Sequence, residues 1–161
     1  FLTYSAPKTF PLVIIPFNAL HHCTDHSQLR EMGRAAYRAL VQGGYLALDC
    51  YLIDRNLYHR DPDERYEPRW FTHPQSGEPL YSWEQSWWEE ESHTHHVMYS
   101  YQRSNGSVEQ THLALHMYDR PVLRTIIEDC GFSLVKEWAD FQNGTVGEKD
   151  HKWIAIFRRQ D

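Results

Sequence analysis

The apolar positions of this chain fall into short continuous runs and helical repeats, which predicts a mixture of strands and helices. The first run, Leu12–Phe17, is continuously apolar and rich in β-branched residues, which is typical of a parallel strand covered on both faces. Pro16 has no N–H for a sheet, so it is expected at the end of this strand. A second apolar run covers residues 45–53 and predicts another strand.

A helix is predicted between these two strands. Asp25, followed three residues later by Gln28, matches a capping box at its start. Its buried face is expected to contain Leu29, Met32, Ala36 and Leu40. Gly43 and Gly44 are expected to end the helix, because glycine readily adopts the left-handed conformation of a C-cap. Strand, helix and strand together make a βαβ unit.

The C-terminal half predicts a hairpin, a second helix and two further strands. Residues 93–117 form the expected hairpin around Asn105-Gly106, the strongest short hairpin signal. The helix is expected to begin near Asp119 as a plain cap and to stop at Gly131. The last two strands are expected at 133–141 and 152–158. This order places the chain in the α/β class.

Residues 54–92 differ in composition from the rest of a chain that we expect to form a single domain over 1–161. They contain four of the eight prolines and four of the six tryptophans, and ten acidic against four basic residues. Long ordered insertions of this kind are usually lids or binding loops. An acidic surface loop anchored by aromatic side chains is the alternative.

The charge of the chain restricts its partners. The net charge is −6, from 16 basic and 22 acidic residues, which argues against a nucleic-acid partner, because phosphate binding needs a basic face. No apolar run approaches the roughly 18–20 residues of a membrane span, so no membrane partner is expected.

The cysteines and histidines indicate neither disulfides nor a metal site. Cys23, Cys50 and Cys130 are far apart and form no CxxC pair, which fits a reducing, cytoplasmic compartment. His93 and His95 share one face of a strand, but no cysteine or carboxylate at a matching spacing completes a ligand set. We therefore expect no bound metal.

Four stretches, in order and with the right gaps, carry a family resemblance. They are KTFPLVIIPFNALHH (Lys8–His22), ALVQGGYLALDCY (Ala39–Tyr51), MYDRPVLRTIIEDCGF (Met117–Phe132) and KWIAIFRR (Lys152–Arg159). Together they resemble the C-terminal two-thirds of a class I S-adenosylmethionine-dependent methyltransferase. The resemblance implies a partial Rossmann-like sheet made of the family's fourth to seventh strands, with an inserted antiparallel hairpin. It also implies S-adenosylmethionine as the cofactor and a small-molecule substrate.

The family's glycine-rich cofactor loop, which follows its first strand, is missing from the chain. No GxGxG pattern is present, and about ten residues precede the first strand. The Leu12–Phe17 strand would then have a bare apolar edge, which is a pairing hazard. Three explanations stay open: a missing N-terminal half in the same polypeptide, a partner or homodimer contact at this edge, or a reorganised noncatalytic module.

The resemblance also places candidate site residues at the carboxyl ends of the strands, where open α/β sheets bind ligands. Pro16, Phe17, Asn18 and Ala19 would line the methionine end of the cofactor. His22 would be a catalytic base or a substrate contact. Alternatively, Asn18 only caps a turn and His22 packs against the helix.

Five further residues complete the candidate site. Tyr51 and Tyr118 are candidate catalytic residues that face the substrate. Asp49, Arg120 and Trp70 are candidate substrate contacts, with hydrogen bonds to the backbone or plain solvent exposure as the alternatives.

The leading prediction is therefore an enzyme that transfers a methyl group from S-adenosylmethionine to a small molecule, with this chain supplying the substrate-side half of the site. The alternative is a noncatalytic methyltransferase-like binding or assembly subunit. A glycine-rich turn upstream of Phe1, or on a partner chain, distinguishes the two. The acceptor atom, whether nitrogen, oxygen or carbon, stays open.

Overall fold

The computed structural model describes residues 8–52, 60–147 and 150–161. The contacts divide the chain into two compact units. The first unit consists of residues 1–53 and 116–161, and the second of residues 54–115. This division differs from the single domain that we expected from the sequence. Each unit contains a four-stranded sheet of its own.

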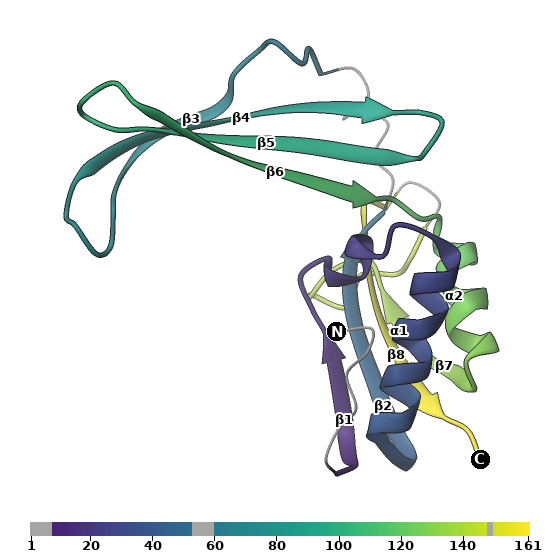
Figure 1. Ribbon diagram of the computed structural model, residues 1–161. Helices are drawn as coiled ribbons and strands as arrows, with labels where there is room; N and C mark the ends of the chain where they lie inside the picture. The colour runs from purple at the N-terminus through teal and green to yellow at the C-terminus, as the bar shows by residue number, and fades with distance from the viewer. Residues whose placement is uncertain (1–7, 53–59, 148–149) are drawn as a thin grey trace. The chain divides into compact units, whose positions relative to one another are not determined.

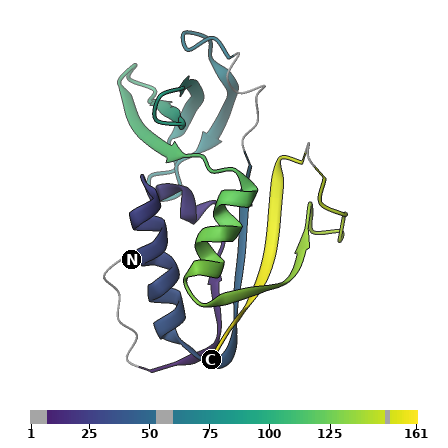
Figure 2. The same ribbon diagram turned by 90° about the vertical axis from the view of Figure 1, so that its right-hand side faces the viewer.

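The first unit is a four-stranded sheet with both of its α-helices on one face (Figures 1 and 2). Its elements are β1 (Phe10–Ile15), η1 (Ala19–His22), α1 (His26–Ala39), β2 (Leu40–Tyr51), α2 (Arg120–Asp129), β7 (Phe132–Trp138) and β8 (Lys152–Arg159). The strand order is β1-β2-β8-β7. β1 and β2 are parallel, whereas β8 runs antiparallel to both of its neighbours.

The core of the first unit lies between the sheet and its two helices. Leu46, Leu48 and Cys50 alternate along β2 and are buried against the helices. Trp153 and Phe157 are completely buried on β8. Ala155 is buried between them on the same face, and Ile154 and Ile156 are partly buried on the opposite face, as expected for a strand inside a sheet. α1 begins as the sequence predicts, since the Asp25 carboxylate accepts a hydrogen bond from the Gln28 N–H at 2.8 Å.

The prediction that Gly43 and Gly44 end the first helix is wrong. α1 ends at Ala39, and both glycines lie inside β2. A Cβ on Gly44 would lie 2.9 Å from the Val41 carbonyl oxygen and 3.1 Å from that of Pro11. Gly43 has a φ of +70°. Gly44 therefore lets β1 approach the start of β2, where the register between the two strands shifts.

The second unit is a separate four-stranded sheet in the order β3-β4-β5-β6. The strands are β3 (Tyr66–Thr72), β4 (Pro79–Glu89), β5 (Thr94–Gln102) and β6 (Val108–His116). The 93–117 hairpin is present as β5 and β6, and Gly106 in its turn has a φ of +85°. The 54–92 segment contains β3 and β4, which pair with each other and extend this hairpin into a sheet; whether it acts as a lid stays a prediction.

β1 is an edge strand with an apolar surface. In the part of the chain that the structure describes, β1 pairs with β2 alone. Leu12 and Ile14 project to the face opposite the helices, where they are 46% and 60% exposed. Among the described residues, no helix has the length and apolar character that crossing a bilayer requires.

Candidate functional site

Hydrogen bonds of Asn18 join the carboxyl ends of β1 and β2. Because these strands are parallel, their ends meet at the same edge of the sheet. The Asn18 N–H donates to the Asp49 carbonyl oxygen at 3.2 Å, and the Asn18 side-chain oxygen accepts from the Tyr51 N–H at 2.6 Å. Asn18 therefore takes part in a turn, as the sequence alternative allowed, and that turn lies at the predicted ligand edge.

The turn after β1 is strained. Phe17 and Asn18 both adopt left-handed backbone conformations, with φ of 59° and 62°. Such conformations cost energy in non-glycine residues, and they cluster at functional sites. The Asp49 carboxylate stabilises the turn, because it accepts a hydrogen bond from the Phe17 N–H at 3.0 Å. The Phe17 side chain is 90% exposed.

Lys152 adds a cation to this edge. Its Nζ lies 3.7 Å from the second carboxylate oxygen of Asp49. The same ammonium group lies 5.2 Å from the Tyr51 ring centroid and 4.5 Å from that of Phe141. Sequence reasoning missed Lys152, and only the antiparallel register, which pairs it with Tyr51, reveals the contact. Asp49 and Tyr51, both predicted, are thus brought together with Asn18.

A buried histidine supports the same edge from inside. The two ring nitrogens of His21 lie 2.9 Å from the His116 carbonyl oxygen and 2.8 Å from that of Tyr51. Burial lowers the pKa of His21, and a neutral imidazole donates only one of these two bonds. The predicted residue, His22, is exposed instead. Nothing in the sequence distinguishes these adjacent histidines.

Tyr118 is buried beside this histidine. Its hydroxyl donates a hydrogen bond to the Cys23 carbonyl oxygen at 2.6 Å. Burial raises the pKa of this hydroxyl, with Cys23 and Asp25 as further contributors. The Tyr118 ring stacks on that of His21 at a centroid distance of 6.3 Å. The hydroxyl therefore already has a partner within the core, and Tyr118 is only 2% exposed.

The remaining candidates lie elsewhere. Arg120 Nη1 is 3.5 Å from Glu137 Oε1, in an ion pair at the start of α2. Trp70 belongs to β3 of the second unit and is 70% exposed, with its ring 5.1 Å from that of Tyr81. Within the described residues, no three histidines, cysteines or carboxylates are placed to hold a metal ion.

No protein-family model and no curated protein matches the chain. Solved structures do resemble it. The CcbJ methyltransferase from Streptomyces caelestis matches 99% of the chain with a TM-score of 0.75 at 15% identity, over 61% of its own length. An S-adenosylmethionine-dependent methyltransferase from Clostridium acetobutylicum matches 99%, also with a TM-score of 0.75, at 10% identity and over 62% of its length.

A third similar structure is the sugar N-methyltransferase KedS8 from Streptoalloteichus, with a TM-score of 0.70 at 13% identity. It covers 99% of the chain, which covers 60% of KedS8. The chain thus spans about three fifths of the length of each of these structures. It has the fold of class I S-adenosylmethionine-dependent methyltransferases.

Proposed function

We propose that this chain supplies the substrate-side half of an enzyme that transfers a methyl group from S-adenosylmethionine to a small molecule. The observation that carries the proposal is the sheet of the first unit. Its strands lie in the order β1-β2-β8-β7, and only β1 and β2 are parallel among the described strands. This sheet belongs to a fold that the chain shares with methyltransferases over 99% of its length. These strands correspond to the fourth, fifth, seventh and sixth strands of the family.

The residues at the carboxyl edge fit this role. S-adenosylmethionine supplies an electrophilic methyl group, so the protein mainly aligns the reactants. The turn of Pro16, Phe17, Asn18 and Ala19 would hold the methionine end, and its strained, exposed backbone supports that assignment. Tyr51, beside this turn, is accessible to a ligand, since it is 53% exposed.

The similar solved structures suggest a class of methyl acceptor, which we include in this proposal. KedS8 is described as a sugar N-methyltransferase, and CalS10, which matches with a TM-score of 0.66, as an amino pentose methyltransferase. We therefore propose a small polar metabolite, such as an amino sugar, as the acceptor. His22 and Asp49 would contact it as base and as hydrogen-bond acceptor.

The cofactor half of the site would come from residues that precede this chain in the same polypeptide. Support comes from the exposed edge of β1 and from an apolar groove of about 410 Å³ between β1 and α1. Val13, Ile15 and Met32 line this groove. A further strand on β1 would cover the edge and satisfy its unpaired backbone groups. A partner chain or a second copy would satisfy the same edge, and in that case the chain would be an assembly subunit.

The test uses the polypeptide extended upstream of Phe1 and compares two asparagine variants. Asn18 and Asn143 both have a left-handed backbone, with φ of 62° and 67°, so glycine replaces each of them without strain. S-adenosylhomocysteine binding is measured by calorimetry. We expect Asn18→Gly to weaken binding about tenfold or more, and Asn143→Gly to leave it unchanged. Equal affinities for all three proteins, or no binding by any of them, would contradict the proposal.

A further inference from the structure

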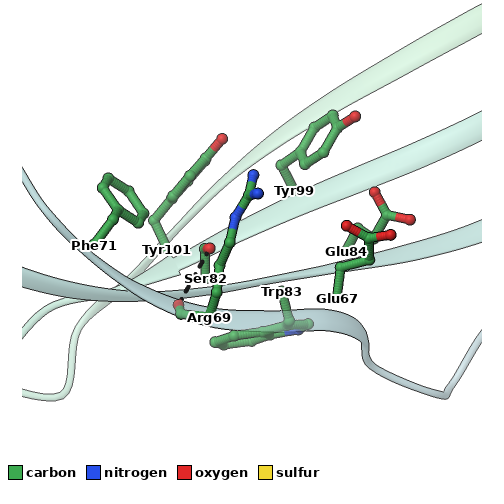
Figure 3. A pocket seen from close by; sticks show the side chains of 8 residues that line it. All are labelled: Glu67, Arg69, Phe71, Ser82, Trp83, Glu84, Tyr99 and Tyr101. Atoms are coloured by element: carbon green, nitrogen blue, oxygen red, sulfur yellow. Dashed lines mark hydrogen bonds between the residues drawn. The ribbon is translucent and has the colours of Figure 1, made fainter.

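The second unit has its own cavity, of about 490 Å³, on one face of its sheet (Figure 3). This volume is in the range of small-molecule sites, about 300–1,000 Å³. β3, β4 and β5 all contribute to its lining. All of the lining residues belong to the second unit.

The cavity has aromatic walls. The Phe71 and Tyr101 rings pack edge to face, with their centroids 6.0 Å apart. Tyr99 lies on the same face of β5, two residues before Tyr101. Trp83 contributes from β4, and Arg65 covers its ring at 4.1 Å. Such walls bind a flat apolar group through stacking and edge-to-face contacts.

A free cation lies between these rings. Figure 3 shows the guanidinium group of Arg69 rising from β3 between Tyr99 and Tyr101. Within the described residues, this guanidinium group forms no hydrogen bond and no ion pair. A planar guanidinium without a partner is suited to bind a carboxylate through two parallel hydrogen bonds.

A free anion lies at the other side of the cavity. Figure 3 shows the carboxylates of Glu67 and Glu84 next to each other. Arg60 neutralises Glu84 through a 2.8 Å ion pair, whereas Glu67 has no such partner in the described part of the chain. Burial raises the pKa of Tyr99; the charges of Glu84 and Glu67 add to this rise, and that of Arg69 opposes it.

Glu67 has an energetically unfavourable backbone conformation. Its φ is 50°, in the left-handed region. The register between β3 and β4 shifts between Tyr66 and Arg69, so Glu67 lies in a bulge. Bulges redirect side chains and are common next to binding sites. The bulge brings a carboxylate to the cavity that Arg69 also lines.

We propose that this cavity binds a free amino acid with an aromatic side chain, with its carboxylate on Arg69 and its ammonium group on Glu67. One unpaired cation and one unpaired anion match a zwitterion better than a ligand of either single charge. The aromatic side chain of the ligand would lie against Phe71 and Tyr101.

Three ligands of nearly equal shape test this proposal on the full chain. L-phenylalanine is the zwitterion, phenethylamine has only the ammonium group, and 3-phenylpropanoate has only the carboxylate. Dissociation constants are measured from amide chemical-shift changes in NMR titrations. We expect L-phenylalanine to bind at least about tenfold more tightly than either singly charged analogue, with the shifts concentrated in β3, β4 and β5.

Two variants assign the charges. Arg69→Gln should weaken the binding of L-phenylalanine and 3-phenylpropanoate but not that of phenethylamine. Glu67→Gln should weaken the binding of L-phenylalanine and phenethylamine but not that of 3-phenylpropanoate. Arg38→Gln and Glu91→Gln are matched controls on exposed residues and should change nothing. The proposal is overturned if no ligand shifts these amides up to about 10 mM, or if phenethylamine binds as well as L-phenylalanine.

Discussion

The side-chain oxygen of Asn18 accepts a hydrogen bond from the backbone N–H of Tyr51 at 2.6 Å, and this bond ties the end of β1 to the end of β2. Thirty-three residues separate the two partners in sequence. The bond lies where the parallel pair of strands ends, so it positions the edge at which the fold is expected to bind its ligands.

Replacing Asn18 by alanine should destabilise the first unit. The change removes an acceptor from the Tyr51 N–H, which costs about 1 kcal/mol. It also places alanine in a left-handed conformation, which costs about 1 kcal/mol more. Asn18→Gly should lose only the hydrogen bond, and so about half as much stability as Asn18→Ala. Urea unfolding measures both variants, and an alanine variant no less stable than the glycine variant would refute this account of the turn.

Acid should destabilise the second unit through His95. Burial, followed by the charges of Arg60 and His96, lowers the pKa of this histidine from 6.5 to about 4. Its Nε2 is buried without a hydrogen-bond partner among the described residues. Between these two pKa values the unfolded chain binds a proton that the folded chain does not, so the free energy of unfolding falls as the pH falls.

His95→Leu should remove this acid sensitivity. We expect the wild type to lose about 1–2 kcal/mol more than the variant between about pH 7 and about pH 5. His22→Leu, at an exposed histidine, is the control and should keep the wild-type slope. Tryptophan fluorescence monitors urea unfolding, since four of the six tryptophans lie in the second unit. Parallel pH profiles for wild type and His95→Leu would show that His95 is not responsible.

Gly33 of α1 packs tightly against Cys130, the C-cap residue of α2. A Cβ at this position would lie 2.7 Å from Cys130 Sγ. Gly33→Ala should therefore destabilise the protein by about 1–3 kcal/mol through overpacking, although alanine favours helices by up to about 1 kcal/mol. Cys130→Ala should rescue much of the loss in the double variant, as measured by thermal unfolding. A Gly33→Ala protein as stable as the wild type would mean that the helices separate freely.

The exposed edge of β1 should cause self-association in this chain alone. Ile14 is 60% exposed on β1, and Val135 is 54% exposed on β7 at the opposite edge of the sheet. Ile14→Lys should shift sedimentation toward the monomer, because a lysine on an edge strand opposes pairing. Val135→Lys is the matched control and should have a smaller effect. A wild-type chain that stays monomeric at all concentrations would argue that β1 needs no partner.

Local sequence signals were sufficient to predict most of the helices and strands of the first unit. The apolar run at Leu12–Phe17, the cap at Asp25 and the alternation in β8 each describe a residue's immediate neighbours, which periodicity can detect. The prediction for Gly43 and Gly44 is wrong because their surroundings are long-range: Gly44 meets Pro11 of β1 and Gly43 meets Arg158 of β8, contacts that no local pattern reveals.

The second unit and the site were less predictable for the same reason. Prolines and acidic residues in 54–92 obscured β3 and β4, whose stability comes from pairing within a sheet rather than from an apolar alternation. At the site, His21 and Lys152 were missed because burial and antiparallel register select them. The proximity of Asn18, Asp49 and Tyr51 was predictable, because all three lie at the ends of two neighbouring parallel strands; their roles at a site stay a prediction.

The most direct test of the proposed half-site is a calorimetric titration of S-adenosylhomocysteine into two polypeptides. One is this chain of 161 residues, and the other is the same chain extended by the residues encoded upstream of it. We predict saturable binding with one ligand per extended polypeptide and no measurable heat with the chain alone, because the strand that pairs with β1 and the glycine-rich turn are both needed. Saturable binding by the chain alone, or no binding by the extended polypeptide, would contradict this account.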